Sequence, residues 1–339
     1  MANSERNNFW KDASVLITGG AGFIGSHFAR NLVLAGARVT VVDNLERGSF
    51  NSISDIINDI VFMDLDMSLE KECDAAFLQE YDIVVHFASK VGGIGYYTAH
   101  SYDVIQKMNK IDTNILERVI LNSVPMYFYA SSAHVYPIEL QGTPDSLAIS
   151  EDLAYPTNTE LSYGWAKLIS EKQIEYAAQQ NPNFSAAIAR YIGIYGPGQD
   201  YNLETGSVIP VFTHRALKYP EIPFSIWGTG QETRSYCYID DAIECTKLMI
   251  EKMQHKNIVG PLNVGKQERI KIEDIAKNVI DISEKDIIIE YDTTKETKIW
   301  GQWCDCSLAS EELDGWKAKT SFEEGLRMVY KDIEKRINE

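Results

Sequence analysis

The sequence predicts an α/β protein, with a doubly wound parallel sheet and a smaller C-terminal α/β domain built onto it. Short, almost entirely apolar runs alternate with helical patterns through the first half, which is typical of parallel strands covered on both faces. A glycine-rich turn directly follows the first apolar run and opens a helix. The length of 339 residues allows a core domain and a smaller partner.

The predicted elements follow this alternation. Strands are expected at Ser14–Thr18, Arg38–Val42, Ile60–Met63, Ile83–Phe87, Met126–Ala130 and Ala186–Arg190. Helices are expected at Gly22–Ala35, Ala99–Leu121 and Glu160–Gln179. Beyond a Gly/Pro turn at Tyr195–Gly198, we expect a helix near Ser207–Lys218, a short strand at Pro223–Trp227 and a helix at Asp240–Met253. The sheet domain is therefore predicted to span 12–190 with a return segment at about 223–253, and the smaller domain 191–222 and 254–335.

The composition narrows the classes of function. A net charge of −17 argues against nucleic acid as a partner, because phosphate binding needs a basic surface. No apolar run approaches the ~18 residues of a membrane span, and residues 1–11 contain no signal-peptide core. The five cysteines are scattered and odd in number, which fits a reduced compartment, and they show no zinc-site spacing. We therefore expect a cytoplasmic protein without a membrane partner or a metal.

The glycine-rich turn has the pattern of a dinucleotide site. It reads Gly19-Gly-Ala-Gly22-Phe-Ile-Gly25, and its glycines let backbone N–H groups approach a pyrophosphate at the helix N-terminus. The second strand ends in Asp43, where a carboxylate binds the adenosine ribose and repels a 2′-phosphate. The pattern therefore predicts NAD(H) in preference to NADP(H). Arg47 is the one nearby residue that could accommodate a 2′-phosphate.

Further cofactor contacts are expected at the carboxyl ends of the strands, where ligands lie in such sheets. Asp64 and Leu65 follow the third strand, and Ala88 and Ser89 end the fourth. The full set expected to hold the cofactor is Gly19, Gly22, Phe23, Ile24, Gly25, Asp43, Asn44, Asp64, Leu65, Ala88, Ser89 and Lys167.

A second pattern indicates proton-transfer chemistry. The fifth strand leads into Ser132-Ala-His134, and a later helix carries Tyr163 and Lys167 one turn apart on one face. A phenol with a pKa near ~10 is a weak base at neutral pH, but a lysine ammonium and a positive nicotinamide ring both favour the phenolate. Tyr163 can then take a proton from a substrate hydroxyl as hydride leaves the same carbon, while Ser132 holds that hydroxyl. The expected catalytic residues are thus Ser132, Tyr163 and Lys167.

These motifs together resemble the extended short-chain dehydrogenase/reductase superfamily, in particular its nucleotide-sugar epimerases and dehydratases. The similarity runs from about Ser14 to about Arg327. Later segments agree with it, namely Tyr195–Pro197, Trp227–Arg234, Tyr238–Asp241 and Leu313–Trp316. The resemblance implies a Rossmann fold, NAD as the cofactor and a nucleotide-sugar substrate. It also implies a homodimer or higher homo-oligomer, with the dimer packed through the Ala99–Leu121 and Glu160–Gln179 helices.

The resemblance also implies a substrate side. The arginine that matches Arg234 grips the nucleotide diphosphate in that family, and the segment that matches Ser207–Pro210 lies along the nucleotide. The residues expected to contact the substrate are Gly93, Ser132, Val208, Trp227, Gln231 and Arg234.

Within the superfamily, Val91–Gly95 and Ser131–Pro137 are most similar to GDP-mannose 3,5-epimerases and GDP-fucose synthases. Those families have a cysteine acid/base at the position of His134 and a lysine or histidine near Ser207–Val208. Neither Ser207 nor Val208 can act as a strong acid or base, which argues against a two-base 3,5-epimerisation. Dehydratases carry an Asp-Glu pair at the position of Ala133-His134, so elimination of water is not expected.

His134 has two interpretations, a polar contact in the pocket or an added acid/base. Because it lies two residues beyond Ser132 on a segment expected to be extended, its side chain should point to the same side. The function expected is an NAD-dependent nucleotide-sugar epimerase that acts through a transient 4-keto sugar, with a GDP-sugar favoured over a UDP-sugar. The alternative is a 4-dehydrogenase that releases the keto-sugar. A non-catalytic NAD-binding regulator is the third hypothesis, but such proteins lose the tyrosine or lysine that this chain keeps.

Overall fold

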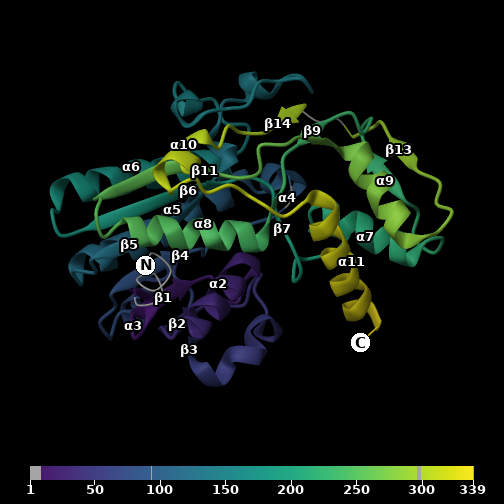
Figure 1. Ribbon diagram of the computed structural model, residues 1–339. Helices are drawn as coiled ribbons and strands as arrows, with labels where there is room; N and C mark the ends of the chain where they lie inside the picture. Colours follow the sequence, from purple (N-terminus) through teal and green to yellow (C-terminus); the bar gives the residue numbers. More distant parts are fainter. Residues whose placement is uncertain (1–8, 93, 296–298, 339) are drawn as a thin grey trace.

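A seven-stranded parallel sheet organises the computed structural model, which describes residues 9–92, 94–295 and 299–338 (Figure 1). Its strands are β1 Ser14–Thr18, β2 Arg38–Val42, β3 Ile60–Met63, β4 Ile83–His86, β5 Met126–Ser132, β6 Ser185–Tyr191 and β11 Ile258–Val264. They lie in the order β11-β6-β5-β4-β1-β2-β3, and all neighbouring pairs are parallel. The order reverses between β1 and β4, and the carboxyl ends at such a point open the crevice in which ligands bind.

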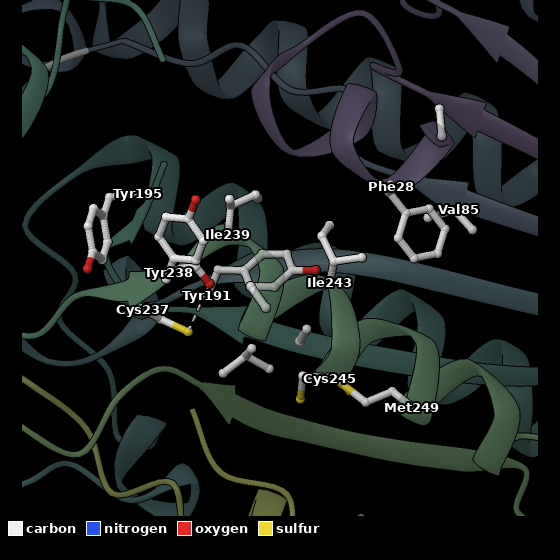
Figure 2. Packing of buried hydrophobic residues seen from close by; sticks show 14 of the residues in the cluster. Phe28, Val85, Tyr191, Tyr195, Cys237, Tyr238, Ile239, Ile243, Cys245 and Met249 are labelled. Carbon is white, nitrogen blue, oxygen red and sulfur yellow. Dashed lines mark hydrogen bonds between the residues drawn. The ribbon is translucent and has the colours of Figure 1, made fainter. Parts of the chain in front are cut away.

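Helices cover both faces of the sheet. One face carries α2 (Phe23–Leu34) and α8 (Ile239–Lys252), and the other carries α3 (Glu70–Ala76), α5 (Ser101–Leu121) and α6 (Ser162–Gln180). α2 and α8 bury mainly apolar faces, as the helical period allows, whereas the buried faces of α5 and α6 also carry polar and charged side chains, Asp112, Lys167 and Glu171 among them. Figure 2 shows part of the hydrophobic core under α2 and α8, in which Ile239, Ile243 and Met249 come from α8 and Phe28 from α2. The sheet is therefore doubly wound, as the sequence predicted.

A smaller lobe follows the sheet in the chain and lies at the right of Figure 1. Its helices α7 (Val208–Lys218), α9 (Ile272–Ser283) and α11 (Phe322–Asn338) pack on one another. Its strands are short: β8 Ser225–Trp227 with β13 Glu290–Asp292, β12 Ile270–Lys271 with β9 Thr233–Arg234 and β14 Gly301–Gln302, and β7 Ile194–Tyr195 with β10 Cys237–Tyr238. One core cluster runs from β1 through α8 to α9 and α11, so the lobes share a hydrophobic core.

The remaining elements are short. They are α4 (Ile94–Ala99), α10 (Ser307–Glu312) and 3-10 helices at Phe50–Asp59, Ala133–Val135, Ile138–Gln141 and Glu151–Ala154. Among all the helices that the structure describes, none combines the length and the apolar character of a membrane span.

The seventh strand, β11, lies where the sequence indicated no strand. Gly260-Pro261 interrupts its apolar pattern, and the pairing with β6 shifts register between Val259 and Leu262. A proline and a bulge are tolerated because β11 is an edge strand. Part of the predicted 254–335 segment therefore belongs to the main sheet, whereas β8, inside the predicted return segment 223–253, pairs with β13 outside it.

Candidate active site

The glycine-rich turn brings the ends of two strands into close contact. Gly19 has a φ of +70°, and a Cβ there would lie 2.6 Å from the backbone nitrogen of Ala88 at the end of β4. A Cβ on Gly25 would collide with the carbonyl oxygen of Gly19 and lie 2.7 Å from the Cα of Gly20. Only glycine fits both positions, so the N-terminus of α2 is held tightly against the sheet. The first residues of α2 line the crevice, and a helix N-terminus at this place suits a pyrophosphate.

Asp43 fixes the end of β2 against this turn. Its carboxylate oxygens accept hydrogen bonds from the backbone N–H groups of Ala21 (3.0 Å) and Leu45 (2.9 Å). The side chain is buried, and burial raises its pKa, although these N–H donors act in the opposite direction. A negative charge therefore lies at the carboxyl end of β2, where an adenosine ribose is bound in a Rossmann fold.

A cavity of about 300 Å³ opens along the carboxyl ends of β1, β2, β4 and β5. The expected residues that line it are Gly19, Gly22, Phe23, Ile24, Gly25, Asp43, Asn44, Leu65, Ala88, Ser89, Ser132, Tyr163 and Lys167. Asp64, the first residue after β3, does not line the cavity, and its side chain is exposed. The backbone of the glycine-rich turn suits a pyrophosphate, and the Asp43 carboxylate at the end of the next strand suits a ribose. These residues therefore fit NAD.

Ser132, Tyr163 and Lys167 meet at the other end of this cavity. The Lys167 Nζ lies 5.7 Å from the centroid of the Tyr163 ring and 4.5 Å from that of Tyr129. Burial raises the pKa of Tyr163 to about 12, while the nearby hydroxyls of Ser89 and Ser132 lower it. Burial also lowers the pKa of Lys167. Because burial disfavours both charged forms, the phenolate needs a positive charge held close to it.

His134 stands beside this group. Its ring packs edge-on against Tyr163 with 5.9 Å between centroids, and its backbone N–H donates to the Ser132 Oγ at 3.2 Å. The expected extended segment is wrong here, because β5 ends at Ser132 and a 3-10 helix follows. Burial, and then the charge of Arg234, lowers the pKa of His134 to about 4. The imidazole is therefore neutral near pH 7 and can accept a proton.

The expected substrate residues do not all converge on this end. The charge of Arg234 lowers the pKa of His134. Its guanidinium donates hydrogen bonds to the carbonyls of Thr233 (2.8 Å) and Ile299 (3.0 Å). The Gln231 side chain instead contacts Glu273 and Lys271, and Gln231 lines a separate hollow together with Thr233 and Lys271. Trp227 is half exposed under Lys295, and Val208 begins α7. Gly93 lies outside the described residues.

Several residues of the site were not predicted. Glu46, Asp66, Lys90 and Lys107 line the same cavity, and the Lys107 Nζ pairs with Glu46 at 3.0 Å and with Asp66 at 3.1 Å. Asp66 and Lys90 each directly follow a predicted strand-end pair, Asp64-Leu65 and Ala88-Ser89. The strand-end pattern therefore extends to both residues. Lys107 lies in the middle of α5 and gives no local signal.

Arg47 and Tyr97 are two further side chains of the site. Arg47 lines the cavity but pairs with Asp200 at 3.4 Å, so its charge is partly engaged. Tyr97, from α4, packs against Tyr163 with 4.9 Å between ring centroids, and burial raises its pKa. No local pattern distinguishes Tyr97 from its neighbours in the sequence.

A Rossmann sheet with a serine, a tyrosine and a lysine at one end of its crevice defines an extended short-chain dehydrogenase/reductase. Residues 15–265 match the NAD dependent epimerase/dehydratase family, and the chain belongs to that family. The protein is therefore an NAD-dependent enzyme of nucleotide-sugar metabolism.

Relatives within the family act on different nucleotides. The chain is 28% identical to the GDP-mannose 3,5-epimerase of Arabidopsis thaliana, over 98% of this chain and 86% of that protein. It is 27% identical to the UDP-glucose 4-epimerase of Bacillus subtilis, over 92% and 94%. The crystal structure of UDP-glucose 4-epimerase from Thermotoga maritima with UDP-glucose has a TM-score of 0.84 at 26% identity, over 95% of this chain and 99% of that one.

Proposed function

We propose that the protein is a nucleotide-sugar epimerase that acts through a transient 4-keto sugar. The observation that carries this proposal is the meeting of Ser132, Tyr163 and Lys167 at one end of the cavity, with the neutral His134 beside them. Reversible oxidation at one carbon needs a base, a hydroxyl to orient the substrate and a cation near the base. Tyr163 supplies the base, Ser132 the hydroxyl and Lys167 the cation.

Each side chain has a definite task in this proposal. The Tyr163 phenolate takes the proton from the sugar hydroxyl and returns it when the ketone is reduced on its other face. Ser132 hydrogen-bonds that oxygen throughout, and the Lys167 ammonium stabilises the phenolate. NAD, held by the Gly19–Gly25 turn and Asp43, supplies a reversible acceptor of the hydride. Proton and hydride both return to the sugar, so the epimerisation is balanced and consumes no cofactor.

A GDP-sugar is the proposed substrate class. The segments Val91–Gly95 and Ser131–Pro137, and the similarity to GDP-mannose 3,5-epimerase, support this choice. Plain inversion at C4 is favoured over 3,5-epimerisation, because the second acid/base position is occupied by Ser207, whose hydroxyl lies 3.4 Å from the Gln199 amide. His134 would then be the group that removes a proton beside the ketone.

Turnover of GDP-, UDP- and dTDP-sugars in heavy water tests this function. C4 inversion of a GDP-sugar without NADH accumulation is the expected result. Deuterium at C3 or C5 would assign His134 an acid/base role. Accumulation of NADH with a released keto-sugar would replace the epimerase with the 4-dehydrogenase. Turnover of UDP-sugars alone would contradict the choice of nucleotide.

We also propose a homodimer packed through α5 and α6. These helices lie side by side, and they expose Tyr102, Trp165, Ile169 and Tyr176 on their outer face. Such a set of large apolar side chains is typical of a protein interface. Light scattering should give twice the chain mass of 38.3 kDa, and charged substitution of Trp165 and Ile169 should give monomers.

A cytoplasmic location is proposed as well, supported by five cysteines that are all buried free thiols.

A further inference from the structure

A buried polar network lies behind Lys167, away from the cavity. The Asp112 carboxylate, on α5, accepts hydrogen bonds from the Tyr129 hydroxyl (2.6 Å) and the Ser170 hydroxyl (2.6 Å) and contacts the His86 Nε2 at 2.9 Å. The other nitrogen of His86 lies 2.7 Å from the Thr18 Oγ1 at the end of β1. Asp112 is only 2% exposed, so its charge is removed from water. A buried carboxylate is costly unless it is hydrogen-bonded and paired with a cation.

The surrounding charges leave one cation for Asp112. The second buried carboxylate nearby, Glu171, is held by Arg190 through bonds of 3.0 and 2.7 Å. His86 is no counter-charge, because its burial lowers its pKa and keeps the ring neutral. Lys167 is 2% exposed and forms no ion pair within 4.0 Å among the described residues. Lys167 is therefore the cation left to balance Asp112, and the charge of each favours the ionised form of the other.

The Tyr129 ring connects these two groups. Its face lies 4.5 Å from the Lys167 Nζ, and its hydroxyl donates to Asp112. A carboxylate that accepts this hydrogen bond makes the ring more electron-rich, which strengthens its attraction for the ammonium. The charged and titratable groups that face Lys167 are Asp112 from α5, Tyr163 and Glu171 from α6, Tyr129 from β5 and His86 from β4.

We propose that Asp112 is a positioning residue that holds Lys167 as an ammonium beside Tyr163. This inference rests on the proposed function for its catalytic meaning, but the ionisation that it describes does not depend on any substrate. In this arrangement His86, Ser170 and Tyr129 keep the carboxylate ionised and in place. Lys167 then remains charged in a cavity whose burial would otherwise neutralise it, and it can stabilise the Tyr163 phenolate.

The direct test is a titration of Lys167 by NMR in the NAD-saturated protein, with lysine labelled at the ε-carbon by ¹³C. The Lys167→Arg variant assigns the resonance. In the parent, Lys167 should stay protonated through neutral pH. In Asp112→Asn its midpoint should fall by about one pH unit or more, because the lost negative charge no longer opposes burial. Asp103→Asn, which removes the same charge from an exposed site on α5, should leave the midpoint unchanged.

Three results would overturn the inference: a neutral Lys167 at pH 7 in the parent, an equal midpoint in Asp112→Asn, or an equal shift in Asp103→Asn. The first of these needs only Lys167→Arg, for the assignment, so the test survives if Asp112→Asn fails to fold. A kinetic arm uses the basic limb of kcat for sugar oxidation, which should move to lower pH in Asp112→Asn while KM changes little. Absence of sugar oxidation in the parent would contradict the proposed function, whereas the NMR titration would still decide the role of Asp112.

Discussion

The cofactor end and the sugar end of the cavity are built in different ways. At the cofactor end, Gly19, Gly25 and Asp43 come from two short consecutive segments, and backbone contacts set their positions. At the sugar end, Ser132 from β5 and Tyr163 from α6 line the cavity, His134 on a 3-10 helix packs against Tyr163, and Arg234 on β9 lies near His134. Side chains, not backbone, define that end. The geometry of the cofactor end therefore depends on the backbone, whereas that of the sugar end depends on single side chains such as His134.

The largest effect should come from Tyr163→Phe. The change removes the proton acceptor while the ring still packs against Tyr97 and His134, so the fold and NAD binding should persist. We expect sugar oxidation to fall by ~10²–10⁴-fold, the usual contribution of a general base. Stopped-flow measurement of NADH formation gives the rate, and calorimetry gives NAD affinity. A variant that retains a tenth of the parental rate would show that another group is the base.

His134→Asn should separate two steps at the sugar end. Solvent exchange at C3 or C5 should fall by ~10²-fold, while hydride transfer at C4 changes much less. The pKa of about 4 means that His134 is already a neutral base well above that pH. Exchange in the parent should therefore be flat from about pH 5 to 8 and decline only as the pH approaches 4. If the parent shows no exchange at all, His134 is a contact in the pocket.

Gly25→Ala tests the cofactor end. The new methyl group would collide with backbone that cannot move independently, and a clash in a packed site costs about 1–3 kcal/mol. NAD affinity and the free energy of unfolding should both fall, as measured by calorimetry and by urea denaturation. Gly142→Ala is the matched control, because its methyl group would lie 4.0 Å from the nearest atom. Equal behaviour of the two variants would mean that the turn is not closely packed.

Asp43→Asn should have the smallest effect. Removing the charge should narrow the preference for NAD over NADP on the order of tenfold, since a 2′-phosphate would no longer meet a carboxylate. The pKa of Asp43 is raised, so the parent itself should lose part of this preference as the pH falls and the carboxyl is protonated. Equal affinities for both cofactors in the parent at pH 7 would assign the 2′ position to Arg47 instead.

The cofactor end could be predicted from the sequence more fully than the sugar end. The Gly19–Gly25 turn and Asp43 could be selected because a strand, a turn and a helix N-terminus lie within a short stretch of chain. The edge strand β11 could not, because Gly260-Pro261 breaks the pattern that a strand normally shows. Gln231 lies three residues before Arg234 in the motif, yet its side chain contacts Lys271 and Glu273 and lines a different hollow from the main cavity. Proximity in the sequence did not reveal which hollow the side chain enters.

The sequence by itself determined the doubly wound sheet, the dinucleotide turn and the Tyr163-Lys167 pair, because each depends on periodicity or spacing within one or two elements. Only the tertiary structure decided what surrounds that pair. Asp112 and Glu171 are both acidic residues on helices, and no local pattern distinguishes them. The crossing of α5, α6, β5 and β6 gives Glu171 to Arg190 and leaves Asp112 with Lys167. Charge compensation in a core depends on which elements meet, and that is a property of the fold.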